Sequence, residues 1–243
     1  MNNPKTKNFN VISEDERTNF KATISRFPEE MKYADKLLYL YENLASHLST
    51  YPRDLTPVLL MYWTCFRGFL ISSQLMFQAH LPEAYAIISR SAEAVASARK
   101  MSINPEKVPE WIKAEKDTSQ PFRRILGKLF PKEDKLLYPE IFNIYELMSE
   151  CGRHPSFYST IFFSNFEKMK TENKVEFIYC DIEDEANLKR SFNYQVYVYL
   201  KFLSVFKEIF KKHLAKDWIK EFDQFEDGYR TYRETLRGVF KSG

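Results

Sequence analysis

Glycine and cysteine are both scarce in this sequence of 243 residues, which has six glycines and three cysteines. Phosphate-binding loops depend on glycine, and neither a GxGxxG nor a GxxxxGK[ST] pattern occurs, so nucleotide-binding folds built on such loops are disfavoured. Cys65, Cys151 and Cys180 are far apart and form no CxxC pair. This spacing argues against both a zinc site and a disulfide framework.

Histidine is also rare, and the sequence lacks the common catalytic and metal-binding motifs. None of the four histidines follows a glutamate by three positions, and neither HExxH nor GxSxG occurs. Di-metal bundles need Glu-x-x-His pairs, because residues three apart share one face of a helix. The sequence therefore predicts no metal and no cofactor, and it favours a non-catalytic role.

No hydrophobic run is suited to crossing a membrane. The most apolar stretch, residues 57–81, contains Arg67 near its middle, and a charge there costs at least ~2.5 kcal/mol on insertion. The first ten residues are polar and lack the apolar core of a secretion signal. We therefore predict a buried helix at 57–81, no membrane association and a cytoplasmic location.

Apolar residues recur every three to four positions along most of the chain, which predicts an all-α fold. Capping residues, prolines and this periodicity place a first helix from about Ser13 to the interruption at Pro28. Further helices are expected at 28–48, 57–80, 82–101, 109–130, 139–152, 183–214 and 215–239. The prediction is a helical bundle of about six to eight helices.

The periodicity also predicts which side of each helix is buried. In 57–80 the predicted core face is Leu59, Trp63, Phe66 and Leu70, at spacings of four, three and four. The helix at 82–101 is rich in small residues, so it should approach its neighbours closely and lie centrally. Its predicted core stripe is Ala84, Ile88, Ser91, Val95 and Ala98. The helix at 183–214 carries the longest seam, namely Phe192, Val196, Tyr199, Leu203, Phe206 and Phe210.

The pattern indicates one helical domain at 12–243, with its bundle core at about 55–214, after a disordered or loosely held tail at 1–11. Within that domain, in the segment 157–180, Val175, Phe177 and Tyr179 recur at every second position, and the stretch from Phe157 to Phe163 could supply a partner strand. Such alternation is typical of strands, so a small β-hairpin is the alternative to helix in this segment.

Arg90 and Glu93 form the first candidate site. They lie three positions apart in the predicted helix at 82–101, so they can form an ion pair that fixes the register of the helix. Alternatively, Arg90 points into a cleft and binds an anion such as phosphate.

Arg153 and His154 form the second candidate site, where a helix is predicted to end at Gly152. His154 can cap the end of that helix, where the dipole stabilises a positive charge. Alternatively, the adjacent Arg and His contact an anion or RNA from the loop, because imidazole titrates near neutrality and guanidinium grips phosphate.

Three segments together carry a resemblance to a known family. They are PEAYAIISRSAEA at 82–94, YELMSE at 145–150 and the HPS turn at 154–156. Over about residues 55–210, the chain resembles a group of bacterial proteins related to the HEPN superfamily of helical bundles. The resemblance implies an all-α bundle in which the helix with Arg90 and Glu93 lies near the HPS turn.

Active members of that superfamily are metal-independent ribonucleases that use an Arg, four to six intervening residues and a His. Here Arg153 directly precedes His154, so the chain departs from that spacing. If the resemblance extends to activity, it implies that His154 is the general base and that Arg153 or Arg90 stabilises phosphate charge.

Three functions remain open from the sequence. The first is a non-catalytic helical binding module, associated with a protein partner, with nucleic acid or with a defence or toxin–antitoxin system. The second is an endoribonuclease of the HEPN type that uses His154 and Arg153. The third is an oligomeric scaffold in which the aromatic face of the last helix pairs two chains.

Overall fold

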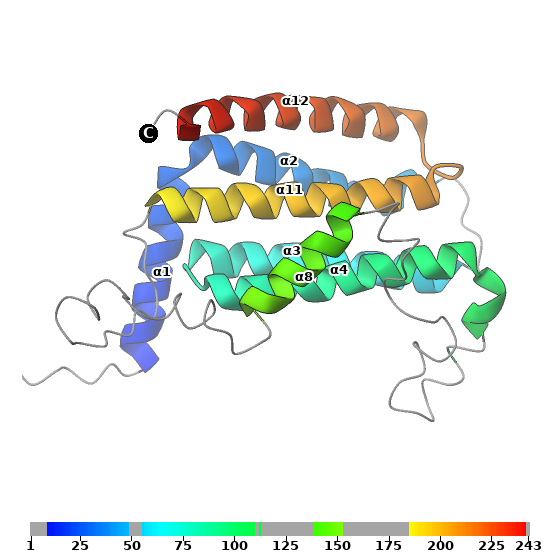
Figure 1. The fold of residues 1–243 in the computed structure, drawn as a ribbon, viewed down its shortest axis with the longest axis horizontal. Coiled ribbons are helices and arrows are strands. Elements are labelled where there is room, and N and C mark those ends of the chain that lie inside the picture. Colours follow the sequence, from blue (N-terminus) through cyan, green and yellow to red (C-terminus); the bar gives the residue numbers. More distant parts are fainter. Residues whose placement is uncertain (1–8, 49–54, 110–111, 113–138, 153–184, 242–243) are drawn as a thin grey trace, which may run out of the picture.

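The chain folds as a bundle of α-helices in a computed structural model, which describes residues 9–48, 55–109, 112, 139–152 and 185–241 (Figure 1). These residues contain no β-strand and only one isolated antiparallel bridge, between Leu48 and Leu214. The fold is therefore all-α, as the sequence predicted. The helices are α1 (Phe9–Arg26), α2 (Pro28–Leu44), α3 (Thr56–Phe77), α4 (Leu81–Ile103), α8 (Pro139–Gly152), α11 (Glu185–Phe210) and α12 (Lys216–Lys241).

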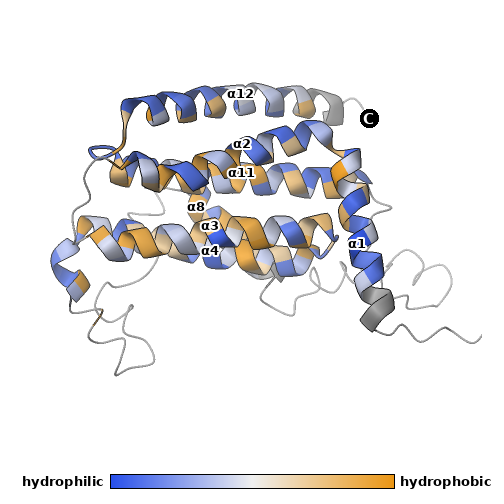
Figure 2. Ribbon diagram, turned by 180° about the vertical axis from the view of Figure 1, so that it is seen from behind, coloured by the Kyte–Doolittle hydropathy of each residue, from blue (hydrophilic) through white to orange (hydrophobic). Residues whose placement is uncertain are grey.

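The long helices lie roughly parallel or antiparallel in layers. Helix α12 covers α2 and α11, and these in turn cover α3 and α4, while α1 stands steeply at one end (Figures 1 and 2). Helix α8 crosses α4, and α4 is the helix that α8 contacts most extensively (Figure 1). Helix α11 contacts α2, α3, α4 and α8, so it is the element around which the others are arranged.

Most helix bounds agree with the sequence predictions to within a few residues, because prolines mark the starts of several helices. Proline occupies the first or second position of α2, α3 and α4, where its missing N–H costs no hydrogen bond. Helix α1 begins at Phe9, four residues earlier than the predicted start at Ser13. Residues 9–11, predicted as part of a loose tail, are therefore helical.

The seams predicted for α4 and α11 are confirmed. All five predicted residues of α4 and all six of α11 are at most 1% exposed. Both helices are buried on several sides, because α4 contacts α3, α8 and α11. The small side chains of α4 thus place it centrally, as predicted.

Gly68 allows α3 and α4 to approach each other closely. A Cβ atom at this position would overlap the Ser91 side chain of α4 and would lie 3.1 Å from the Tyr199 hydroxyl of α11. The Ser91 and Tyr199 hydroxyls are themselves hydrogen-bonded at 3.0 Å. A side chain larger than hydrogen at Gly68 would therefore disturb a contact among three helices.

The predicted core face of α3 is wrong for two of its four residues, whereas Phe66 is buried as predicted. Trp63 and Leu70 point outward, with exposed fractions of 42% and 43%. The buried side of α3 is instead formed by Val58, Tyr62, Cys65, Phe66, Phe69, Ser72, Met76 and Phe77. Apolar residues surround this helix on every side, so periodicity alone could not identify the side that faces its neighbours.

The aromatic face of α12 is buried within the chain. Trp218, Phe222, Phe225 and Tyr229 are at most 7% exposed, and Trp218 donates from Nε1 to the carbonyl of Leu40 in α2 at 3.3 Å. The idea that this face pairs two chains is therefore wrong, because α2 and α11 already cover it. Self-association would require another surface.

Several predictions fall outside the described residues. They concern the segment 1–8, nearly all of the helix at 109–130 and the hairpin at 157–180. Among the helices that the structure does describe, none is both long and apolar enough to cross a bilayer.

Candidate functional site

The two predicted candidate sites are described only in part. Arg90 is exposed on α4, and Glu93 is half-buried one turn further along. The neighbouring Ser89 lies against α8, with 2.7 Å between its Oγ and that of Ser149. Arg153 and His154 follow the end of α8 and lie outside the described residues, so their position relative to Arg90 stays a prediction.

Cys65, the described cysteine, is buried in the core and is unsuited to nucleophilic chemistry. Burial raises the pKa of its thiol to about 12, and a contact of 3.6 Å with the Tyr41 hydroxyl opposes that rise. Burial likewise raises the pKa of the Tyr41, Tyr62 and Tyr199 phenols. All four groups stay protonated at neutral pH, so they serve as hydrogen-bonding groups in the core.

Metal binding finds no support in the described part of the chain. No group of three or more His, Cys, Asp or Glu side chains is arranged there to hold an ion.

The outer face of α3 is the most extensive exposed apolar surface on one helix. Four large apolar side chains point away from the core, namely Leu60 (58% exposed), Trp63 (42%), Leu70 (43%) and Ile71 (36%). They lie at spacings of three, seven and one, so they follow one side of the helix over three turns. Long orange stretches on α3 and α4 in Figure 2 reflect the same composition. Exposed apolar patches of this kind mark interaction sites.

Only one charged residue occurs in the 22 residues of α3. Arg67 lies midway along the helix between Trp63 and Leu70, and it is exposed. It forms no ion pair with any residue that the structure describes. The guanidinium of Arg67, which has no ion-pair partner among the described residues, therefore lies in the centre of the otherwise uncharged outer face of α3.

Packing behind this face holds it in place. The ring of Trp63 contacts the rings of Tyr62 and Phe66, with centroids 5.7 and 5.6 Å apart. On the same helix, the buried Ser72 and its neighbour Ser73 accept hydrogen bonds from Gln195 Nε2 of α11 at 2.7 and 3.1 Å. Helix α3 is thus tied to the centre of the bundle, and its outer side chains are presented from a rigid support.

Comparison with known proteins gave no match. The chain matches no protein family, no curated protein and no solved structure. The function of this chain is therefore inferred from the described residues alone.

Sequence reasoning missed the α3 face because it assigned Trp63 and Leu70 to the core. One available signal was the near absence of charge on this helix, whose exposed side mixes Thr56, Thr64 and Gln74 with apolar residues. Such a helix either lies in the interior or exposes apolar residues, and the sequence favoured the first interpretation.

Proposed function

We propose that this chain is a non-catalytic helical-bundle binding module that docks a partner protein on the outer face of α3. The observation that carries the proposal is the set of exposed side chains Leu60, Trp63, Leu70 and Ile71 on one side of a fixed helix. Trp is enriched among the residues that dominate binding energy at interfaces. An amphipathic helix of the partner suits this elongated apolar surface.

Arg67 supports a partner helix with a carboxylate near its middle. A guanidinium surrounded by apolar contacts is best satisfied by a planar, bidentate carboxylate. Two copies of this chain paired through α3 would place Arg67 close to Arg67 in both parallel and antiparallel arrangements, because the residue lies midway along the helix. Such like-charge contacts are unfavourable, so charge favours a different protein over a second copy.

The first experiment identifies the partner and locates its contact. A photo-crosslinking amino acid replaces Leu60, and the captured protein is then purified and its binding measured directly. The proposal predicts that Trp63→Ala weakens this binding by about 30-fold or more, as expected for an anchor worth about 2 kcal/mol. Leu147→Ala on α8 is the matched control, since Leu147 is 45% exposed and lies on another helix.

A charge exchange tests the role of Arg67. Arg67→Glu should weaken binding at least tenfold, and an acid-to-lysine change in the partner helix should restore it. Binding that is unaffected by both Trp63→Ala and Arg67→Glu would exclude the α3 face as the docking site.

Ribonuclease activity and nucleic-acid binding are the other functions predicted from the sequence. No described residue favours ribonuclease activity over binding, and incubation with labelled RNA in EDTA beside His154→Ala is the direct test. Nucleic-acid binding predicts an affinity that falls steeply with salt. A cytoplasmic location, a bacterial origin and a role in a defence or toxin–antitoxin system likewise stay predictions.

A further inference from the structure

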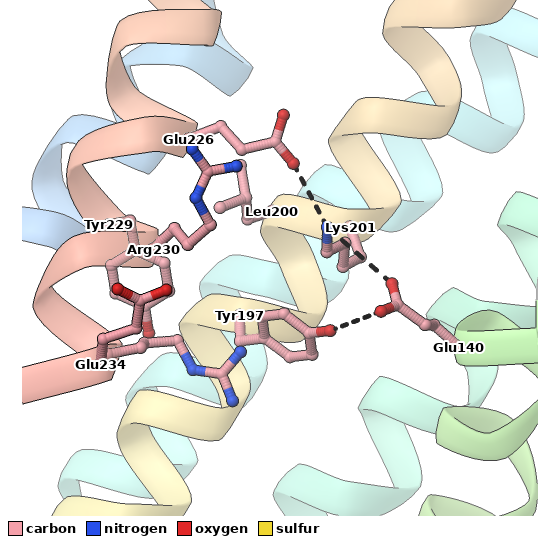
Figure 3. A pocket seen from close by; sticks show the side chains of 9 residues that line it. Glu140, Tyr197, Leu200, Lys201, Glu226, Tyr229, Arg230 and Glu234 are labelled. Atoms are coloured by element: carbon pink, nitrogen blue, oxygen red, sulfur yellow. Dashed lines mark hydrogen bonds and ion pairs between the residues drawn. The ribbon is translucent and has the colours of Figure 1, made fainter. Parts of the chain in front are cut away.

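A cleft of about 280 Å³ lies between α11 and α12, with the start of α8 at one end (Figure 3). Its apolar lining includes Leu200 and the ring of Tyr229. Charged side chains of both signs also line it, and they come from three helices. The volume lies near the lower limit of small-molecule sites, so the cleft suits one small ligand.

Two of the acids in this cleft already have partners. The Tyr197 hydroxyl donates to Glu140 Oε1 at 3.0 Å, while Lys201 Nζ lies 3.8 Å from Glu140 Oε2 and 3.3 Å from Glu226 Oε1 (Figure 3). Burial, followed by the hydrogen bond to Glu140, raises the pKa of Tyr197, which keeps its phenol protonated as a donor. Lys201 is thus neutralised within the protein.

Arg233 differs from the other cations of the cleft. Arg230 pairs with Asp227 at 2.7 Å, whereas Arg233 forms no ion pair with any residue in the described ranges. The guanidinium of Arg233 instead lies over the ring of Tyr197, with its Cζ atom 3.7 Å from the ring centroid. This cation–π contact fixes the plane of the guanidinium, and its N–H donors have no ion-pair partner among the residues that the structure describes.

We infer that the cleft binds a small monocarboxylate with an apolar body, and that Arg233 holds the carboxylate. A planar guanidinium with free donors matches a carboxylate in a bidentate arrangement. Leu200 and Tyr229 line the cleft but are each at most 2% exposed, so the cleft accommodates only a small apolar body. Three carboxylates, Glu140, Glu226 and Glu234, lie in the same cleft, so a single negative charge is favoured over the double charge of phosphate.

This site is separate from the α3 face, because it is built from α8, α11 and α12. Its test can therefore fail without affecting the docking proposal. Conversely, a partner bound to α3 leaves the cleft prediction unchanged.

The experiment uses benzoate as a monocarboxylate probe and inorganic phosphate as the comparison. Benzoate is titrated into the full chain while the Arg Nε–H resonances are followed by NMR. We expect saturable binding with a dissociation constant on the order of 1 mM, as befits so small a ligand. The resonance of Arg233 should shift, and phosphate should bind more weakly than benzoate.

Three variants define the role of Arg233. Arg233→Gln should weaken benzoate binding at least tenfold. Arg233→Lys, which keeps the charge but loses the fork of donors, should weaken it less. Arg17→Gln, at an exposed position on α1, is the control and should change nothing. Circular dichroism checks that each variant is folded. If Arg233→Gln does not fold, the effect of Arg233→Lys on benzoate binding decides the test.

Three results would overturn the inference. The first is the absence of saturable benzoate binding. If Arg233→Gln then lowers the melting temperature, Arg233 serves only to hold α12 to α11. The second is binding that Arg233→Gln does not alter. The third is tighter binding of phosphate, which would exclude the monocarboxylate as the ligand class.

Discussion

Cys65 shows how burial suppresses the reactivity of a single residue. Its side chain is fully buried between α3 and α2, close to the Tyr41 hydroxyl. Because the thiolate is the reactive form, a thiol with a pKa of about 12 reacts slowly even where reagent can reach it. The residue therefore belongs to the packing of the core.

We predict that Cys65 reacts with a thiol reagent only when the protein unfolds. The measurement uses Ellman's reagent on a Cys151→Ser, Cys180→Ser variant, which leaves Cys65 as the sole thiol. The native protein at mildly alkaline pH should show almost no reaction, and denaturant should release one equivalent. Rapid labelling of the native protein would contradict the buried position.

Gly68 and Gly228 provide opposite predictions for the same change. Gly68→Ala should destabilise the protein by about 1 to 3 kcal/mol, because the new methyl group overlaps Ser91 in the contact between α3 and α4. Gly228→Ala should stabilise it by about 0.5 to 1 kcal/mol, since no atom lies within 4 Å of the new Cβ. Urea unfolding of both variants measures the difference. Equal effects would show that helix propensity outweighs packing at Gly68.

Glu30 is a buried carboxylate that joins three helices. It is 2% exposed and accepts a hydrogen bond from Tyr232 of α12, while Lys189 Nζ of α11 lies 3.2 Å away. Burial raises the pKa of this carboxyl, but the hydrogen bond from Tyr232 and the interaction with Lys189 lower it, and the net result is a lowered pKa. The ionised form is thus favoured in the folded protein.

We therefore predict that Glu30 stabilises the fold most at neutral pH. A carboxyl whose pKa is lower in the folded state contributes stability above its unfolded pKa, and this contribution is lost as the pH falls towards the folded value. Glu30→Gln should cost about 1 to 3 kcal/mol at neutral pH and clearly less at a pH below about 3. Urea unfolding at both pH values measures this. A cost that does not change with pH would contradict the role of the charge.

At the scale of elements, α12 is held by its aromatic side. Trp218 stacks on Phe222 with centroids 5.6 Å apart and donates to Leu40 of α2, while the Tyr229 hydroxyl donates to the carbonyl of Asn193 in α11 at 2.6 Å. Ion pairs on the border add little by comparison, because they are partly exposed. The attachment of α12 is therefore mainly a matter of buried aromatic area.

We predict that Trp218→Ala destabilises the protein by about 3 to 5 kcal/mol, since it removes a fully buried Trp and leaves a cavity. Thermal unfolding followed by circular dichroism is the measurement. Lys32→Ala, at an exposed ion pair of α2, is the control and should change stability by less than about 1 kcal/mol. Comparable effects of the two changes would mean that α12 is loosely attached.

At the scale of the whole molecule, the apolar surface left open is concentrated on α3. Most aromatic residues of α11 and α12 are buried within the bundle, whereas no described residue covers Leu60 and Trp63 on the outer face of α3. Because Arg67 lies in the centre of that face, pairing of two copies through it would bring like charges together.

We therefore predict that the isolated chain is monomeric. Light scattering at micromolar concentrations should give the mass of one chain, 29.0 kDa. A dimer that dissociates on Arg67→Glu or Trp63→Ala would show instead that a second copy occupies α3. A dimer indifferent to both changes would place self-association on a different surface.

Much of the fold followed from the sequence, because the seams of α4 and α11 are strongly periodic and a proline marks the start of α4. Ala84 and Ile88, or Phe192 and Val196, can face only the core if their helices are amphipathic. The interpretation of α3 failed because Leu59, Trp63 and Phe66 are as apolar as the residues opposite them. The cleft was not predicted, since Tyr197 and Arg233 lie 36 positions apart and meet only when α11 and α12 pack.

The sequence by itself determined that the chain forms helices, where most of them begin and end, and which sides of α4 and α11 are buried. These properties depend on residues a few positions apart, so local periodicity is enough to fix them. Only the tertiary structure decided which side of α3 faces outward, that the aromatic residues of α12 are used internally, and that Arg233 meets Tyr197. Those outcomes depend on which helices become neighbours, and that is a property of the packed chain as a whole.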